Sequence, residues 1–199
     1  MTDQETINTY NRGANAYVEK FACIGPLKDD IAHAFGFVGK QNASVLELGC
    51  ANGRDAQEIL KYTNAYIGID ISHEMIRLAR ELLPENHFEV ADMATYEFPN
   101  GLDLVFAFAS LLHLDREAVR LVLQKVCLAL NPGGLVHLRV KQGLYKKFVK
   151  KDEHGSRLFY FYEKKDFEEL IGDQFEIVYD HCSDLQDTPW LMLGLRKIS

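Results

Sequence analysis

A glycine-containing turn with one carboxylate beside it is the segment best suited to chemistry. Residues 45–56 read VLELGCANGRDA, which predicts a strand that breaks into a turn and then a helix. Gly49 and Gly53 have no Cβ and Ala51 has the smallest one, so a ligand could approach this backbone closely. The following helix presents unpaired N–H groups and a partial positive charge, which suit an anionic group. Glu47, before the turn, favours a ligand that also carries positive charge.

Two ligand classes use such a turn: dinucleotides, through their pyrophosphate, and S-adenosylmethionine, through its methionine carboxylate. The dinucleotide fingerprint GxGxxG needs further glycines where this chain has Ala51 and Arg54. The pattern acid-x-G-x-G-x-G is met by Glu47, Gly49 and Gly53, with Ala51 replacing the middle glycine. A carboxylate repels a pyrophosphate but attracts an ammonium or sulfonium ion. The turn therefore favours S-adenosylmethionine, although Glu47 could also be a plain surface residue at a strand end.

Acids also end the next two predicted strands. Asp70 lies 21 positions after Gly49, the spacing at which an acid accepts hydrogen bonds from a ribose diol. Asp92 is followed by Met93, so the pair could hold an adenine amino group and pack on its ring. Asp92 alone would be a common turn residue. Three acids at the ends of three consecutive strands support an adenosine-containing ligand.

The elements that must position these residues alternate along the chain. Apolar runs separated by helical patterns predict a parallel sheet covered on both faces. The predicted strands are residues 44–49, 65–70, 87–92, 102–109 and 134–141, and the helices between them are residues 54–62, 72–83 and 116–131. The first forty residues read as helical with a break at Gly25-Pro26.

The last fifty residues no longer show a regular alternation of strands and helices. A helix over 163–172 precedes two runs, 175–182 and 190–198, that a loop joins without a helix, which predicts an antiparallel hairpin. The expected fold is α/β, a Rossmann-like doubly wound sheet of seven strands. It is mostly parallel with an antiparallel C-terminal hairpin strand, and helices cover both faces. Its ligand site is expected at the carboxyl ends of the middle strands.

Composition and charge argue against several classes of function, among them nucleic-acid binding and membrane insertion. A chain of 199 residues with a net charge of -7 and no long Lys/Arg run is expected to be one domain that does not bind nucleic acid. The densest basic stretch, residues 141–151, predicts a solvated face. No apolar run is long enough for a membrane helix, and the N-terminus does not read as a signal peptide. The cysteine and histidine spacings do not predict zinc, and reduced cysteines fit a cytoplasmic protein.

The chain resembles class I S-adenosylmethionine-dependent methyltransferases over most of its length. VLELGCANGRD resembles the first motif of the family, YIGIDISHEMIRLAR the second, FEVADM the third and LDLVFAFASLLHL the fourth. LNPGGLVHLRVK is similar to the fifth-strand motif, and PWLMLGLRK fits the C-terminal hairpin. The opening Tyr10, Ala14 and Tyr17 resemble the first helix of the small bacterial members. The departure is Ala51, which leaves the backbone path possible.

The resemblance implies a set of cofactor contacts. Asp70 would bind the ribose, with Ile71 and Met75 near the adenine. The full expected set is Glu47, Gly49, Cys50, Ala51, Gly53, Asp55, Asp70, Ile71, Met75, Asp92, Met93, Phe108 and Ala109. The expected division is a helical cap over residues 1–40, a cofactor-binding core over 41–141, and a substrate-side segment with the hairpin over 142–199.

The acceptor side is less determined. His113, after the fourth strand, is the best candidate for a general base because histidine titrates near neutral pH, but it could equally be structural. Tyr10 and Tyr17 could form a lid or belong to the core. Tyr160 or Tyr162 could line an acceptor pocket, or simply pack. Lys141 or Arg139, at the end of the fifth strand, could reach an anionic acceptor.

The sequence thus predicts methyl transfer from S-adenosylmethionine, giving S-adenosylhomocysteine, to an oxygen, nitrogen or sulfur atom of a small molecule. In-line displacement requires mainly alignment, so no catalytic triad is needed. An NAD-type oxidoreductase and a non-catalytic S-adenosylmethionine-binding regulator remain the alternatives. The protein is expected to be a cytoplasmic monomer or homodimer, without a metal or a membrane partner.

Overall fold

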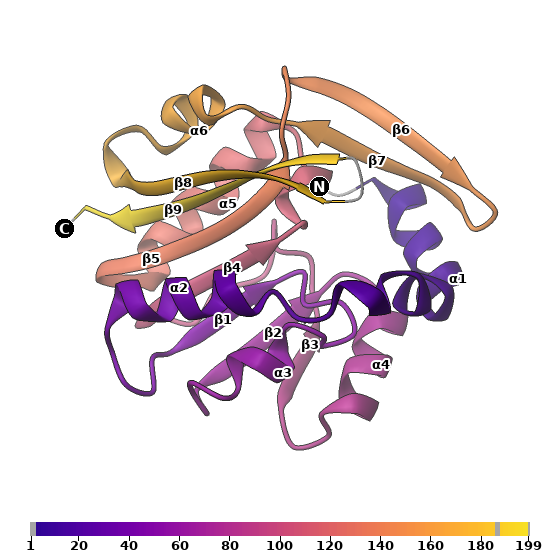
Figure 1. Ribbon diagram of the computed structural model, residues 1–199, viewed down its shortest axis with the longest axis horizontal. Helices are drawn as coiled ribbons and strands as arrows, with labels where there is room; N and C mark the ends of the chain where they lie inside the picture. Colours follow the sequence, from indigo (N-terminus) through magenta and orange to yellow (C-terminus); the bar gives the residue numbers. More distant parts are fainter. Residues whose placement is uncertain (1–2, 186–187, 199) are drawn as a thin grey trace.

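The computed structural model describes residues 3–185 and 188–198. A seven-stranded sheet in the order β3-β2-β1-β4-β5-β9-β8 forms its centre (Figure 1). The strands are β1 (Val45–Leu48), β2 (Tyr66–Asp70), β3 (His87–Val90), β4 (Leu102–Phe108), β5 (Leu130–Lys141), β8 (Phe175–Leu185) and β9 (Thr188–Lys197). The first five strands pair in parallel, and β9 is antiparallel to both β5 and β8. The predicted doubly wound sheet with an antiparallel C-terminal hairpin is confirmed.

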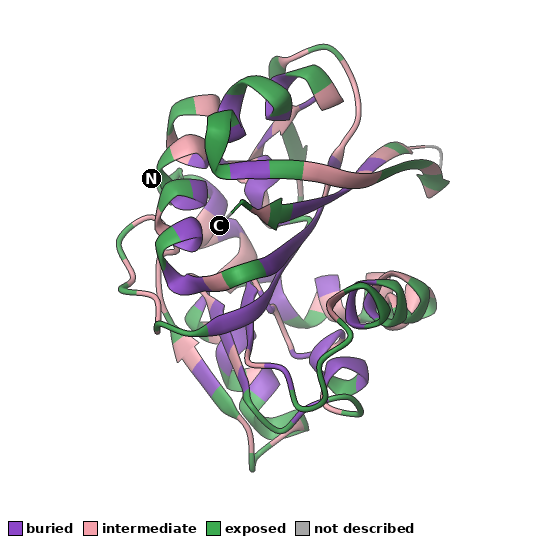
Figure 2. Cartoon of the chain, turned by 90° about the vertical axis from the view of Figure 1, so that its left-hand side faces the viewer, coloured by how far each residue is buried: buried purple, intermediate pink, exposed green. Residues whose placement is uncertain are grey.

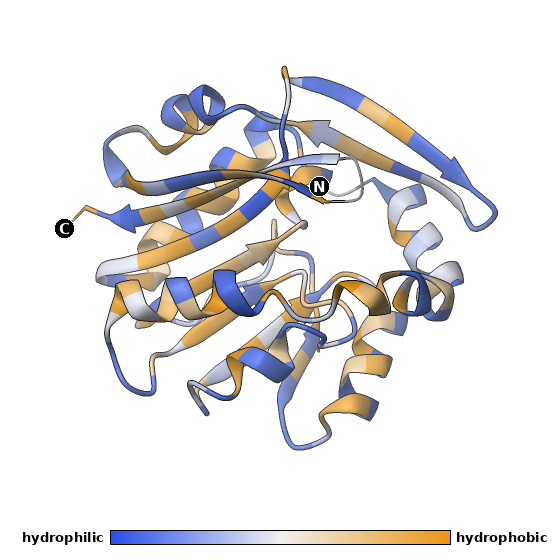
Figure 3. Ribbon diagram, viewed as in Figure 1, coloured by the Kyte–Doolittle hydropathy of each residue, from blue (hydrophilic) through white to orange (hydrophobic). Residues whose placement is uncertain are grey.

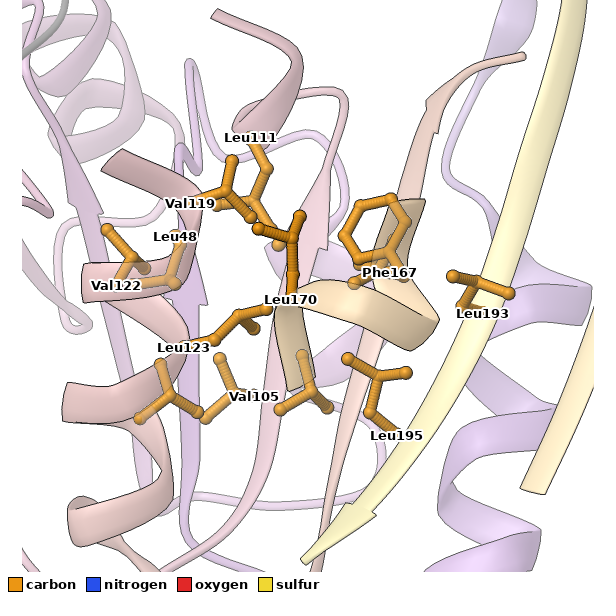
Figure 4. Packing of buried hydrophobic residues seen from close by; sticks show 14 of the residues in the cluster. Leu48, Val105, Leu111, Val119, Val122, Leu123, Phe167, Leu170, Leu193 and Leu195 are labelled. Carbon is orange, nitrogen blue, oxygen red and sulfur yellow. The ribbon is translucent and has the colours of Figure 1, made fainter. Parts of the chain in front are cut away.

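Helices cover both faces of this sheet. They are α2 (Lys28–Val38), α3 (Ala56–Ile59), α4 (His73–Leu82), α5 (Arg116–Ala129) and α6 (Lys164–Ile171), whereas α1 (Gln4–Phe21) packs outside these two faces. Strand β4 shows the division, because Phe106 packs with α2, α3 and α4 while its neighbour Val105 packs with α5 and α6. Figure 4 shows the second cluster, in which Leu123 of α5 and Leu170 of α6 lie close to Val105. In Figure 2 the inner strands of the central sheet are largely buried, whereas the edge strands and the outer faces of the helices are partly exposed.

Two elements, α3 and β5, differ most in length from the sequence prediction. The helix predicted over 54–62 is a single α-helical turn, because the residues after Ile59 continue in tighter turns such as Tyr62 N–H to the Ile59 carbonyl. Strand β5 begins at Leu130 rather than 134. Its pairing with β4 is interrupted after Leu130 and resumes at Leu135, so residues 131–134 form the irregular part of the ladder.

Residues 142–162 form a second, two-stranded sheet that the sequence did not predict. Strand β6 (Lys146–Asp152) pairs with β7 (Gly155–Phe161) in an antiparallel hairpin, whose β6 side is exposed and rich in lysine (Figure 3). Helix α1 lies against β7, where Thr6 Oγ1 accepts a 2.8 Å hydrogen bond from Leu158 N and Thr9 Oγ1 donates a 3.0 Å hydrogen bond to the Ser156 carbonyl. These contacts fix α1 as a cover over the carboxyl ends of the central strands.

Candidate functional site

A cavity of about 480 Å³ lies at the carboxyl ends of β1, β2 and β4, beneath α1. The chain order reverses here, since β2 and β3 extend the sheet on one side of β1 and β4 and β5 on the other, which is where doubly wound folds bind ligands. Thirteen sequence-predicted residues line it: Tyr10, Tyr17, Gly49, Cys50, Ala51, Asp55, Asp70, Ile71, Met75, Met93, Phe108, Ala109 and His113. Seven predicted residues lie outside this lining: Glu47, Gly53, Asp92, Arg139, Lys141, Tyr160 and Tyr162.

The turn after β1 has the conformation that its glycines suggested. Gly49 adopts a φ of 78°, and a Cβ at this position would overlap the Cβ of Ser110. Ala51, in place of the middle glycine, has a φ of 47°, a left-handed conformation that costs an alanine on the order of 1 kcal/mol. Ala109 at the end of β4 is also left-handed, with a φ of 54°. Two strained alanines on one cavity wall are typical of a functional site.

Asp70 is held at the end of β2 by the backbone. Its Oδ2 accepts a 3.0 Å hydrogen bond from Ala51 N, and its Oδ1 accepts a 2.8 Å hydrogen bond from Ser72 N. Burial raises the pKa of this carboxyl, although these backbone donors favour the ionised form. Each oxygen keeps a second lone pair. The carboxylate is therefore oriented toward the cavity without being fully satisfied by the protein.

Glu47 lies behind the turn. Its carboxylate accepts a 2.5 Å hydrogen bond from Tyr66 Oη, and only 1% of the residue is exposed. Gly68, paired with Glu47 across the sheet, makes room, because a Cβ there would lie 2.5 Å from the Tyr66 hydroxyl. Burial, and next the negative charge of Asp55, raise the pKa of Glu47 to about 8. Glu47 is thus paired with Tyr66 of the neighbouring strand β2, and its attraction for a positively charged ligand stays a prediction.

The third acid has a local role. Asp92 Oδ1 accepts a 2.9 Å hydrogen bond from Ala94 N, as a turn residue does, while the adjacent Met93 lines the cavity. Gly53 has a φ of 78°, and a Cβ built at this position would lie about 3.5 Å from the side chains of Phe88, Ala79 and Leu83. It therefore shapes the turn from the protein side.

Asp55 connects the turn to the N-terminal segment. Its Oδ1 accepts a 2.8 Å hydrogen bond from Leu27 N, and its Oδ2 forms a 2.6 Å ion pair with Arg54. Arg54 itself lines the cavity, close to the turn backbone. In the sequence, Arg54 stands where the dinucleotide fingerprint has a glycine. Its position directly after the glycine-containing turn is the sequence signal for a partner of an anionic group.

His113 is held on both sides. Its Nδ1 lies 2.6 Å from the Leu158 carbonyl oxygen. Because a carbonyl oxygen can only accept a hydrogen bond, Nδ1 carries the hydrogen in the neutral ring. Its Nε2 then accepts a 3.0 Å hydrogen bond from Tyr10 Oη. Burial, with the nearby Arg157 and Lys141, lowers the pKa of His113 to about 4. His113 is therefore neutral near pH 7, and Tyr10 stands between its basic nitrogen and the cavity.

Arg157 and Asp152 of the β6–β7 hairpin support the same wall and were missed from sequence. Asp152 accepts hydrogen bonds of 2.8 and 2.9 Å from Tyr17 Oη and one of 2.9 Å from Arg157 Nη2. The Arg157 guanidinium, only 4% exposed, stacks 4.2 Å from the Tyr17 ring centroid and 5.3 Å from that of Tyr10. No local pattern signals this cluster, because its members come from opposite ends of the chain.

The remaining predicted acceptor-side residues lie outside the cavity lining. Tyr160 stacks on Tyr145, with ring centroids 5.8 Å apart, and Tyr162 is buried with its hydroxyl on the Leu114 carbonyl. Arg139 is paired with Asp30 at 3.2 Å. Lys141 ends β5 near the Trp190 ring. Both tyrosines thus pack against neighbouring residues, and their contact with an acceptor stays a prediction.

Comparisons with known proteins agree with this geometry. A family model described as a methyltransferase domain matches residues 45–134. The chain is 32% identical over 121 residues, 58% of its length, to malonyl-[acyl-carrier protein] O-methyltransferase 1 of Ilyobacter polytropus, and covers 45% of that protein. It is 35% identical over 100 residues, 49% of its length, to trans-aconitate 2-methyltransferase of Sinorhizobium medicae, and covers 38% of that protein. The chain thus spans about half the length or less of these curated relatives.

The fold comparison covers more of the chain. The structure of 1,6-didemethyltoxoflavin-N1-methyltransferase from Burkholderia thailandensis, which contains S-adenosylhomocysteine, superposes with a TM-score of 0.76 over 97% of this chain and 88% of that one, at 16% sequence identity. The likeness therefore includes the helical cap and the C-terminal hairpin as well as the matched domain. The matched methyltransferase domain, the similar relatives and the shared fold, together with the motif turn and its acids, support a class I S-adenosylmethionine-dependent methyltransferase.

Proposed function

We propose that the protein transfers the methyl group of S-adenosylmethionine to an oxygen, nitrogen or sulfur atom of a small molecule. The observation that carries the proposal is the position of Asp70. Its carboxylate is fixed by Ala51 N and Ser72 N at the floor of the cavity, where it can accept hydrogen bonds from a ribose diol. The proposed cofactor site has an anion-binding turn on one side of this carboxylate and apolar side chains on the other.

The other lining residues fit this cofactor. The turn at Gly49 and the guanidinium of Arg54 would bind the methionine carboxylate. Ile71, Met75 and Met93 would enclose the adenine. The negative charges of Asp55 and Asp70 favour a ligand that carries an ammonium and a sulfonium ion. The cavity volume of about 480 Å³ lies within the range usual for cofactor sites.

The contribution of the chain to catalysis would be alignment. When bound, the cofactor supplies a methyl group already activated on a sulfonium ion. In such a transfer the lone pair of the acceptor would form a bond to the methyl carbon as the carbon–sulfur bond breaks, and the electron pair of that bond would stay on sulfur. Helix α1, fastened to β7 through Thr6 and Thr9, would exclude water and hold the acceptor in line. Such positioning can contribute ~7–11 kcal/mol.

Tyr10 and His113 would form the proton path for an acceptor that arrives protonated. The Tyr10 oxygen would take the proton of the acceptor as its own passes to His113 Nε2, 3.0 Å away. Because the pKa of His113 is lowered to about 4, this path is a weak base near neutral pH. The site therefore suits acceptors whose nucleophilic atom is already deprotonated.

Calorimetric titration tests the cofactor. S-Adenosylhomocysteine should bind, and NAD should not. Asp70→Ala should weaken binding by roughly 1–3 kcal/mol, the scale of lost charged hydrogen bonds, whereas Asp92→Ala should have a smaller effect because Asp92 lies outside the cavity lining. Binding of NAD in place of S-adenosylhomocysteine would instead support an oxidoreductase. Release of S-adenosylhomocysteine with a panel of acceptors then separates an enzyme from a protein that only binds the cofactor.

A further inference from the structure

Lys141, at the acceptor side of the site, is a cation without a counter-ion among residues 3–185 and 188–198. It ends β5 half-buried, with Nζ 5.1 Å from the Trp190 ring centroid and 5.5 Å from that of Phe159. Within residues 3–185 and 188–198, its Nζ makes no ion pair or hydrogen bond. Arg139, two residues earlier, is by contrast paired with Asp30 at 3.2 Å and with Ser183 Oγ at 3.0 Å. Of the two cations at the end of β5, Arg139 is therefore balanced by Asp30, whereas Lys141 has no carboxylate partner among the described residues.

The surroundings of Lys141 are positive. Burial lowers the pKa of Lys141, and so do the charges of Lys150 and Arg157. Arg157 has a carboxylate partner in Asp152, at 2.9 Å, whereas Lys141 has none in the described part of the chain. A partly buried ammonium among other cations becomes more stable when an anion binds beside it.

Phe159 connects this lysine to the proposed site. The ring of His113, which lines the cavity, has its centroid 4.8 Å from that of Phe159, and Lys141 Nζ lies 5.5 Å from the same ring. The ends of β4 and β5 are also joined directly, because Ala109 N donates a 2.9 Å hydrogen bond to the Arg139 carbonyl. The Phe159 ring is thus a neighbour of both Lys141 and His113, and His113 belongs to the wall where the acceptor would react.

Two further buried donors lie in this region, one beside Lys141 and one in the cavity wall. Trp190, which pairs with Lys141 across the β5–β9 ladder, has a buried Nε1 without a hydrogen-bond partner among the described residues. In the cavity wall, the buried Ser110 Oγ likewise has no partner in the described structure. Buried donors are normally hydrogen-bonded. An oxygen-rich ligand group would supply the missing acceptors.

We propose that the methyl acceptor carries an anionic oxygen group, a carboxylate or a phosphate, and that Lys141 and Trp190 bind that group. The inference rests on the proposed function, since it names the acceptor class of that same site. Lys141 acts here as a specificity-determining residue. The reacting atom of the acceptor would lie toward Tyr10 and His113, on the other side of Phe159.

Fluorescence can test this directly, because Trp190 is the single tryptophan of the chain. The full-length protein, saturated with S-adenosylhomocysteine, is titrated with benzoate, with phenyl phosphate and with the neutral isostere benzamide. We expect a saturable change with at least one anion and a response to benzamide at least tenfold weaker. Preference for benzoate or for phenyl phosphate identifies the group as carboxylate or phosphate. Calorimetry of the same samples provides a second measure of binding.

Matched variants locate the site. Lys141→Met should weaken binding of the anion at least tenfold, and Lys141→Arg should restore it. Lys147→Met, on the exposed face of β6, should leave it unchanged, with circular dichroism confirming the fold of each variant. Equal binding of benzamide and the anions, no anion binding, or an unaffected Lys141→Met variant overturns the inference. The calorimetric binding of S-adenosylhomocysteine is read separately, so failure of the proposed cofactor is distinguished from failure of the anion site.

Discussion

The hydroxyl of Tyr10 and the Nε2 of His113 lie 3.0 Å apart, although 103 positions separate the two residues in the chain. Their contact joins the covering helix α1 to the segment after β4, at the edge of the cavity. Because the other ring nitrogen is held by the Leu158 carbonyl at 2.6 Å, the pair also ties α1 and β4 to the β6–β7 hairpin. This hydrogen-bonded pair is therefore both part of the proposed site and a link among three segments.

A double-mutant cycle measures that link. Tyr10→Phe leaves His113 Nε2 buried without its donor and should cost ~1–3 kcal/mol of unfolding free energy. When Tyr10→Phe is combined with His113→Gln, the two losses of unfolding free energy should be non-additive by roughly 0.5–3 kcal/mol, as measured by urea unfolding. Tyr96→Phe, which removes a distant 3.1 Å bond to Glu89, is the control and should be additive with His113→Gln. Additivity of the first pair would show that the contact contributes nothing to stability.

His113 should make stability depend on pH in the acid range. Its folded pKa of about 4 lies below the ordinary value of 6.5, so the unfolded chain binds more protons between these values and stability falls as pH falls. The slope from this group is at most about 1.4 kcal/mol per pH unit. The cost of His113→Gln in urea unfolding should therefore be smaller at pH 5 than at pH 7.5. The exposed His73→Gln serves as control, and an equal cost of His113→Gln at both pH values would exclude the effect.

Glu47 should produce the opposite dependence. Its folded pKa of about 8 lies above the ordinary value of 4.5, so the folded state holds the extra proton and stability is lost as pH rises between them. Glu47→Gln keeps an oxygen that can accept the Tyr66 hydroxyl but does not titrate. Relative to the unmodified protein, the variant should become more stable as pH rises from 5 to 8.5, by at most about 1.4 kcal/mol per pH unit. If the melting temperatures of the variant and of the unmodified protein change in parallel over this pH range, the prediction is contradicted.

Gly49→Ala separates backbone strain from crowding in the site. Gly49 and Gly133 have φ values of 78° and 75°, but a Cβ at Gly49 would overlap Ser110, whereas at Gly133 nothing lies within 4 Å. Both alanine variants should lose ~1 kcal/mol to the left-handed backbone. Gly49→Ala should lose at least about 1 kcal/mol more from overpacking, and it alone should weaken binding of S-adenosylhomocysteine. Equal losses of unfolding free energy in thermal denaturation would show that Ser110 gives way without cost.

Local patterns were enough to predict most of the fold. Alternating apolar runs and helical periodicities depend only on neighbours within one element, and they placed the seven strands of the central sheet in their correct order along the chain. The β6–β7 hairpin was missed because β6 lacks a buried face: its residues through Lys151 are exposed, so its sequence does not have the period of a half-buried strand. The short α3 was overestimated because its helical pattern continues through residues that form tighter turns.

For the site, residue type and spacing were enough only where the ligand-facing group belongs to a strand end or the turn after it. Gly49, Ala51 and Asp70 follow from such local spacing, and the sequence by itself determined this turn and its neighbouring acid. Only the tertiary structure decided that Glu47 pairs with Tyr66, that Tyr10 contacts His113, and that Lys141 has no counter-ion among the described residues. The reason is physical: hydrogen bonds, burial and charge compensation depend on which distant segments meet, and no period within one element encodes those meetings.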